Sequence, residues 1–136
     1  MFKILKSTFD TGLVTIGYPD SAARIPANFR GAPRFDFARW PDPRPAAEAC
    51  PTGALSVRDS GCSGIVTMDY GLCTYCGECA AADSSGAVRM TGEFELAALS
   101  RRDLVITAEY GAQGELIRLE RGTLERKVRT AIRETL

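Results

Sequence analysis

An internal repeat constrains the fold of this chain more than any other feature of its sequence. Residues 35–37 (Phe-Asp-Phe) align with residues 68–70 (Met-Asp-Tyr), and residues 53–55 (Gly-Ala-Leu) align with residues 86–88 (Gly-Ala-Val), in both cases at an offset of 33 positions. Each half has the pattern of a strand, a loop, a short helix, a turn and a second strand. The repeat therefore predicts an α+β domain built from two similar halves.

A predicted β-hairpin joins the halves. Residues 56–58 and 65–68 are strand-like, and the segment between them is rich in glycine. The compact domain is expected to cover residues 34–91. Residues 1–33 are expected to form an N-terminal extension, in which a short docking helix is followed by an extended segment rich in Pro, Gly and Ala.

The C-terminal extension is expected to cover residues 92–136. A short helix or turn and an extended piece should come first, followed by an amphipathic helix from about Glu115 to Leu136. Apolar residues recur there at every fourth position: Leu124, Val128, Ile132 and Leu136. Such a helical arm could pack on its own domain or lie on a neighbouring subunit, and the sequence leaves both open.

Charge and composition limit the classes of partner and chemistry. The 17 basic residues balance the 17 acidic ones, so we expect a protein partner and no nucleic acid. The sequence has neither a signal peptide pattern nor an apolar run of about 20 residues, which predicts a cytoplasmic chain without a transmembrane span. It contains no histidine and no evident nucleophile–base pair, so we expect a non-catalytic protein.

The five cysteines indicate a metal site held by thiolates. An odd number of cysteines in a cytoplasmic chain is poorly explained by disulfides. Cys73, Cys76 and Cys79 form a C-x2-C-x2-C run, and Cys50 precedes a proline. Four thiolates can also bind zinc, but zinc sites usually pair two C-x2-C units and this chain has one triple run. Cys62 fits no ligand spacing and is expected to be a free thiol.

The cysteine pattern resembles that of bacterial two-cluster ferredoxins, in which a triple run and the Cys-Pro of the opposite half share a cubane. The resemblance implies a ferredoxin-like, pseudo-twofold α+β fold with a ββ hairpin and two short helices. It also implies one [4Fe-4S] cluster bound by Cys50, Cys73, Cys76 and Cys79. The family's second ligand set is absent as a whole, because its four positions hold Trp40, Pro43, Ala46 and Asp83.

Four residues near these sites have individual expectations. Trp40 should fill the volume of the missing cluster by packing. Asp83 is expected to be a surface carboxylate and not an oxygen ligand. Leu72 and Tyr75 are expected to cover the cluster.

The flanks of the core are similar to a narrower family. Residues 12–15, 18–19, 28–31 and 92–97 resemble the ferredoxin-like subunit of formate hydrogenlyase and of other energy-converting, membrane-bound [NiFe] hydrogenases, which is related to the 23-kDa subunit of complex I. The resemblance covers roughly residues 1–105. It implies a relay subunit that contacts other subunits, in particular the small iron–sulfur subunit, on the cytoplasmic side of the inner membrane.

These observations predict an electron-transfer subunit that carries a single [4Fe-4S] cluster within a larger oxidoreductase. Two alternatives stay open. One is a structural or assembly subunit whose metal site only stabilises the fold. The other is a freely diffusing single-cluster ferredoxin, although such carriers are usually short and strongly acidic, whereas this chain is neutral and has long extensions.

Overall fold

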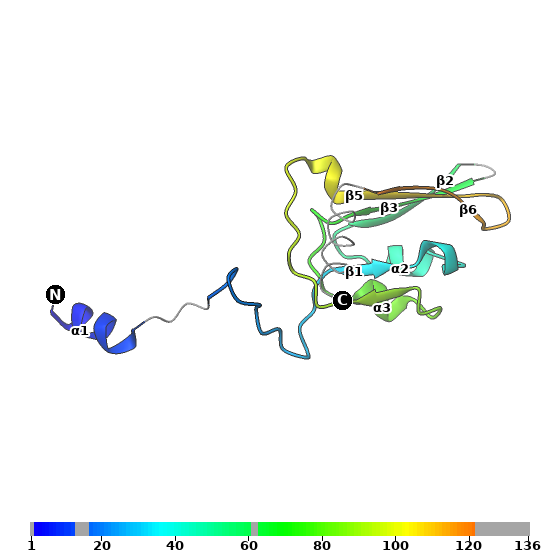
Figure 1. Cartoon of the computed structure of the whole chain (residues 1–136). Coiled ribbons are helices and arrows are strands. Elements are labelled where there is room, and N and C mark those ends of the chain that lie inside the picture. Colours follow the sequence, from blue (N-terminus) through cyan, green and yellow to red (C-terminus); the bar gives the residue numbers. More distant parts are fainter. Residues whose placement is uncertain (1, 13–16, 61–62, 122–136) are drawn as a thin grey trace.

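The computed structural model describes residues 2–12, 17–60 and 63–121. It is a mixed α+β structure of short helices and two antiparallel sheets (Figure 1). In chain order the elements are α1 (Phe2–Thr11), β1 (Pro33–Phe35), η1 (Phe37–Arg39), α2 (Arg44–Glu48), β2 (Leu55–Ser60), β3 (Ser63–Asp69), α3 (Glu78–Ala82), β4 (Val88–Met90), η2 (Arg101–Leu104), β5 (Val105–Tyr110) and β6 (Leu116–Arg121).

The predicted repeat of elements is confirmed. The first half runs β1, η1, α2 and β2, and the second half runs β3, α3 and β4. The first strand of each half pairs with the last strand of the other, because β1 pairs antiparallel with β4 and β2 pairs antiparallel with β3. The pairing of β2 with β3 is the hairpin expected at the centre of the chain, with Leu55 opposite Met68.

Two further strands enlarge the sheet beyond this repeat. Strand β5 pairs with β3, and β6 pairs with β5, so the order in the four-stranded sheet is β2-β3-β5-β6. The extended piece that the sequence predicts at residues 101–104 is instead the 3-10 helix η2, and the strand β5 follows it. The turn between β5 and β6 is closed by a hydrogen bond from the Gly111 amide to the Glu115 carbonyl (2.8 Å), and Gly114 has the positive φ of 79° that such a turn favours.

The predicted C-terminal helix is wrong at its start, since residues 116–121 form a strand. Residues 117–120 alternate apolar and charged side chains, which is the period of a strand, and the every-fourth-residue pattern begins only at Leu124. The glycine turn before them brings these residues to the edge of β5. The rest of the predicted helix, residues 122–136, lies outside the described residues.

The core lies between the four-stranded sheet and a layer made of α2, α3, β1 and β4 (Figure 1). The side chains of β5 alternate, with Ile106, Ala108 and Tyr110 buried. Val66 and Met68 of β3 lie beside them, and aromatic residues of β1 and η1 close the layer from the other side. This core fixes both the loop that follows β3 and the turn that precedes β2.

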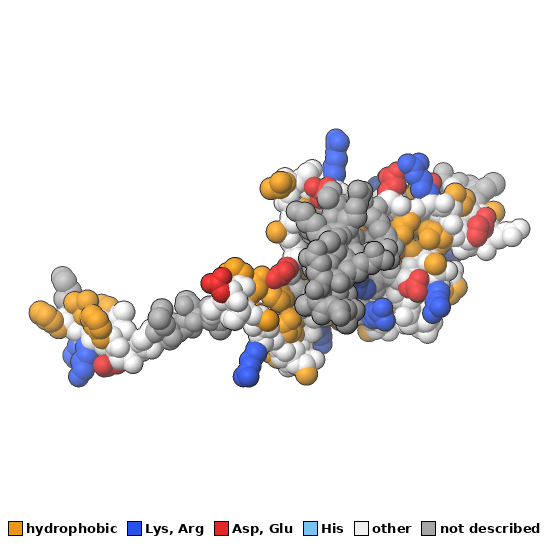
Figure 2. Space-filling view, viewed as in Figure 1, with side chains coloured by type: hydrophobic (Ala, Val, Ile, Leu, Met, Phe, Trp, Pro, Cys, Tyr) orange, Lys and Arg blue, Asp and Glu red, His pale blue; other side chains and the backbone are white. Residues whose placement is uncertain are grey.

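Helix α1 has no buried residue, and its large apolar side chains are 55–87% exposed: Phe2, Ile4, Leu5 and Phe9. Figure 2 shows these apolar side chains gathered on α1, with its lysines beside them. No helix among the described residues is long and apolar enough to cross a membrane.

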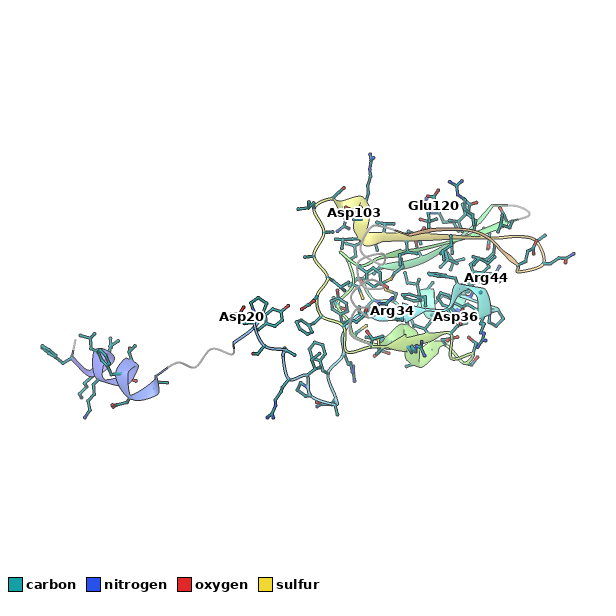
Figure 3. All side chains as sticks on the ribbon, in the orientation of Figure 1. Asp20, Arg34, Asp36, Arg44, Asp103 and Glu120 are labelled. Carbon is teal, nitrogen blue, oxygen red and sulfur yellow. The ribbon has the colours of Figure 1, made fainter. Side chains whose placement is uncertain are left out.

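The end of the extended segment after α1 is hydrogen-bonded to the domain on which it lies. The amides of Gly31 and Ala32 donate to the carbonyls of Thr91 and Glu93, both at 2.8 Å. The Arg34 guanidinium, labelled in Figure 3, donates from Nε to Glu93 Oε2 at 3.0 Å. These bonds attach the N-terminal extension next to β4.

Candidate metal centre

The loop from Cys73 to Cys79 is separated from the end of β3 by three residues and ends in the first turn of α3. It contains two residues in the left-handed region, Tyr75 (φ 55°) and Gly77 (φ 86°). For a residue with a side chain this conformation costs about 1–2 kcal/mol, so the loop keeps Tyr75 there against its local preference. The two left-handed residues turn the backbone between the cysteines of the run, whose side chains line one pocket.

Cys50 arrives from the other half of the repeat. It lies just beyond α2, and its amide donates to the Ala47 carbonyl (3.1 Å). A turn at Gly53, which has a φ of 65°, then leads into β2. Two groups interact with the Cys50 sulfur: the Leu55 amide donates to Sγ at 3.5 Å, and the Thr52 hydroxyl lies 3.8 Å from it.

All four predicted ligands come together. Cys50, Cys73, Cys76 and Cys79 are half-buried, carry no disulfide and line one small pocket. Its other walls come from β1, the start of β2, β3, β4 and the loop itself: Pro33, Thr52, Ala54, Leu55, Met68, Thr74, Tyr75, Gly77 and Met90. Tyr75 is therefore beside the thiols as predicted, whereas Leu72 is not in the lining and is 47% exposed.

The thiols differ in their electrostatic environment. Burial would raise the pKa of Cys50, but the hydrogen bonds from Leu55 and Thr52 outweigh it and the pKa lies below its ordinary value. Burial raises the pKa of Cys73, and the charges of Cys50 and Cys76 add to this, while the Tyr75 amide, 3.4 Å from Sγ, opposes it.

Burial, followed by the charge of Cys73, raises the pKa of Cys79 to about 11. The four groups thus repel one another when ionised, and a cationic centre would be needed to keep all four as thiolates. Such a donor set fits a thiolate-bound metal group.

A single zinc ion and a cubane cluster need different spacings of their four thiolate ligands. Within residues 2–12, 17–60 and 63–121, no three Cys, Asp or Glu side chains are grouped closely enough to hold a single metal ion. A zinc ion requires four ligand atoms within about 2.3 Å of one point, whereas a cubane offers each thiolate its own iron.

The matching positions of the other half are filled by packing. Trp40 is 2% exposed, and Ala46 is equally buried. The Trp40 ring stacks on Phe35 with 5.5 Å between centroids and lies 6.0 Å from Phe37. From β5, the Tyr110 hydroxyl donates to the Phe37 carbonyl (2.9 Å). The prediction that Trp40 is a packing residue is confirmed, and its replacement of a lost cluster stays a prediction.

Asp83 is a partly exposed carboxylate outside the lining of the cysteine pocket, in line with the prediction, and it also has a local structural role. It is half-buried, and it accepts hydrogen bonds from the Ser85 amide (3.1 Å), the Ser85 hydroxyl (2.6 Å) and the Val88 amide (2.8 Å). Burial opposes ionisation, but these bonds lower its pKa. Asp83 thus fixes the turn between α3 and β4, which a ligand spacing argument could not reveal. The predicted free thiol, Cys62, lies outside the described residues.

The spacing of the cysteines does not predict two residues that lie near the thiols. Met90 of β4 enters the pocket wall, and Arg30 of the N-terminal extension donates from Nη1 to the Cys76 carbonyl at 2.6 Å. Arg30 is 46 positions away from Cys76 in the chain. Their proximity depends on how the extension is attached to β4, so no local pattern could have identified them.

A larger cleft of about 490 Å³ lies between the start of α2 and the β5–β6 turn. Its charged residues neutralise one another, since Arg44, labelled in Figure 3, is 3.8 Å from Asp42 and 3.3 Å from Asp59. The described lining contains no cysteine. The cysteine pocket is therefore the better candidate for a functional site. Among known proteins, no family model and no curated sequence matches this chain significantly.

Proposed function

We propose that this chain is an electron-transfer subunit that carries one [4Fe-4S] cluster on Cys50, Cys73, Cys76 and Cys79. The observation that carries the proposal is that two segments far apart in the sequence bring all four thiols to one pocket. When bound, a cubane of this kind exchanges one electron between its 2+ and 1+ core states. The paired halves, in which β1 meets β4 and β2 meets β3, also support the ferredoxin-like fold that the cysteine pattern implies.

The residues of the pocket have distinct tasks in this proposal. Each cysteine supplies one thiolate. The amides of Leu55 and Tyr75 donate to the sulfurs of Cys50 and Cys73 and so favour negative charge there. Apolar walls from Met68, Met90 and neighbouring residues limit the access of water to the thiolates. These features tune how readily the site accepts an additional electron.

The complete replacement of the other ligand set supports a single cluster. Its positions hold a buried ring, a buried methyl group, a proline and the carboxylate that caps the α3–β4 turn. None of the four offers a thiolate, and the rings of Trp40, Phe35 and Phe37 pack in this region. The first half of the repeat thus supplies buried packing side chains and one ligand, Cys50, and the second half supplies the other three ligands.

For the host, we propose a membrane-associated hydrogenase or complex I-like oxidoreductase with the chain on its cytoplasmic side. The resemblance of the flanks is the main support. A second support is α1, whose exposed apolar side chains fit a subunit that docks on other proteins better than a freely diffusing carrier. The chain would then relay electrons to or from the small iron–sulfur subunit and perform no catalysis itself.

Anaerobic expression followed by iron and sulfide analysis and EPR of the dithionite-reduced protein tests this proposal. We expect about four irons per chain and a single S = 1/2 signal. Cys76→Ser should abolish or strongly change the signal, whereas Cys62→Ser, the matched control, should leave it unchanged. Stoichiometric zinc, or an intact fold without metal, would contradict the proposal and favour the structural or assembly subunit.

A further inference from the structure

Arg30 lies against the backbone of the metal-binding loop. Its Nη1 donates to the Cys76 carbonyl at 2.6 Å. A Cβ atom built on Gly77 would be 3.9 Å from both Cδ and Nη1 of Arg30. The guanidinium therefore contacts the two residues at which the loop turns from its second cysteine towards its third.

The backbone that carries Arg30 is fixed to the domain. The amide of the next residue, Gly31, donates to Thr91. A Cβ on Gly31 would be only 2.7 Å from the Glu93 nitrogen and 2.8 Å from its carbonyl carbon, so the two chains lie as close as glycine allows. This close approach holds the start of the Arg30 side chain next to β4 and the loop.

The positive charge of Arg30 is not neutralised by an ion pair. Within the part of the chain that the structure describes, no carboxylate lies within 4.0 Å of its guanidinium, although the neighbouring Glu78 is exposed to solvent at the start of α3. By contrast, Arg34 and Arg101 pair with Glu93 and Asp69. A full cationic charge thus faces the loop of three cysteines.

We propose that Arg30 is a positioning residue that raises the reduction potential of the cysteine site. This inference rests on the proposed function. The site gains one electron from a low-potential donor and later passes it to an acceptor, and no proton needs to move. Reduction makes a site of four thiolates more negative by one charge, and a nearby cation stabilises that state more than the oxidised one. The hydrogen bond to Cys76 keeps this cation in place.

The experiment is an EPR-monitored redox titration of the cluster-loaded full chain and its variants at low ionic strength. Arg30→Gln keeps a hydrogen-bond donor but removes the charge, whereas Arg30→Lys keeps the charge. We expect the Gln variant to have a lower potential, so that its ratio of reduced to oxidised site at a fixed potential falls about three- to tenfold. The Lys variant should stay close to the wild type.

Two comparisons isolate the charge of Arg30. Arg118→Gln, on the edge strand β6 and separated from the β3 wall of the pocket by β5, removes an equal charge and should leave the potential unchanged. The difference between wild type and Arg30→Gln should also shrink at high salt, because the exposed charge is screened. A purely structural role for Arg30 predicts no such dependence on salt.

The outcomes separate this inference from the proposed function. A wild-type chain without a cluster would overturn both. A wild-type cluster whose potential is the same in Arg30→Gln and Arg30→Ala would overturn only the role of Arg30. Loss of the cluster from both neutral variants, but not from Arg30→Lys, would overturn the effect on potential and assign Arg30 to assembly.

Discussion

Trp40 offers the most direct test of how the first half of the repeat is stabilised. The indole is almost fully buried, and it stacks on Phe35. Its Nε1 is buried without a hydrogen-bond partner among the described residues. Trp40→Ala removes the ring and leaves a cavity, which should lower the free energy of unfolding by about 3–5 kcal/mol.

Trp40→Phe should behave differently because two effects oppose each other. The smaller ring loses part of the packing, but it also removes a buried N–H group whose lack of a partner costs about 1–3 kcal/mol. We therefore expect Trp40→Phe to lie within about 1 kcal/mol of the wild type.

The assay is urea unfolding of the cluster-loaded chain under anaerobic conditions, followed by far-UV circular dichroism, with midpoints compared after equal incubation. Leu99→Ala, at a fully exposed apolar residue, is the control and should change stability by less than about 0.5 kcal/mol. The reasoning would be refuted if Trp40→Ala cost less than about 1 kcal/mol, because the ring would then not hold this volume. Equal losses for Ala and Phe would refute the role of the unpaired N–H.

Two further predictions concern the extension and the core. Gly31→Ala places a Cβ against the backbone of Glu93 and should detach residues 17–30 from the domain, so that a protease cleaves them faster. Gly64→Ala is the control, because the nearest atom would be 3.8 Å from the new Cβ, and this variant should be cleaved at the wild-type rate. Burial is the chief cause that raises the pKa of Tyr110 to about 12, so Tyr110 binds its proton more tightly in the folded state than in the unfolded state. The contribution of this proton to the free energy of unfolding is therefore complete below about pH 10. It is lost as the pH rises towards 12, by about 2–3 kcal/mol. In Tyr110→Phe this loss should be absent from a plot of urea midpoint against pH. At neutral pH the missing hydrogen bond to the Phe37 carbonyl should lower the free energy of unfolding by about 1–2 kcal/mol. If the midpoints of wild type and variant fell equally above about pH 10, Tyr110 would not be the group responsible.

The sequence by itself determined the order of elements within residues 34–91 and the candidate ligands. The offset of 33 residues predicted strands and short helices in both halves and the hairpin between them, because the alternation of apolar residues and the glycine-rich turn are local signals. The spacing of Cys73, Cys76 and Cys79 likewise indicated thiolate ligation, since it depends only on nearby residues. The identity of the bound group, the host and the role of residues 122–136 stay predictions.

The tertiary structure decided what the local pattern could not. Residues 116–121 form a strand because the glycine turn places them against β5, although the sequence predicts a helix from about Glu115 onwards. Arg30 reaches Cys76, 46 positions away in the chain, because strand pairing and the close approach at Gly31 bring these two segments together. The spacing of residues along the sequence predicts contacts within one helix, strand or loop. The surroundings of the four thiols depend instead on contacts between such elements.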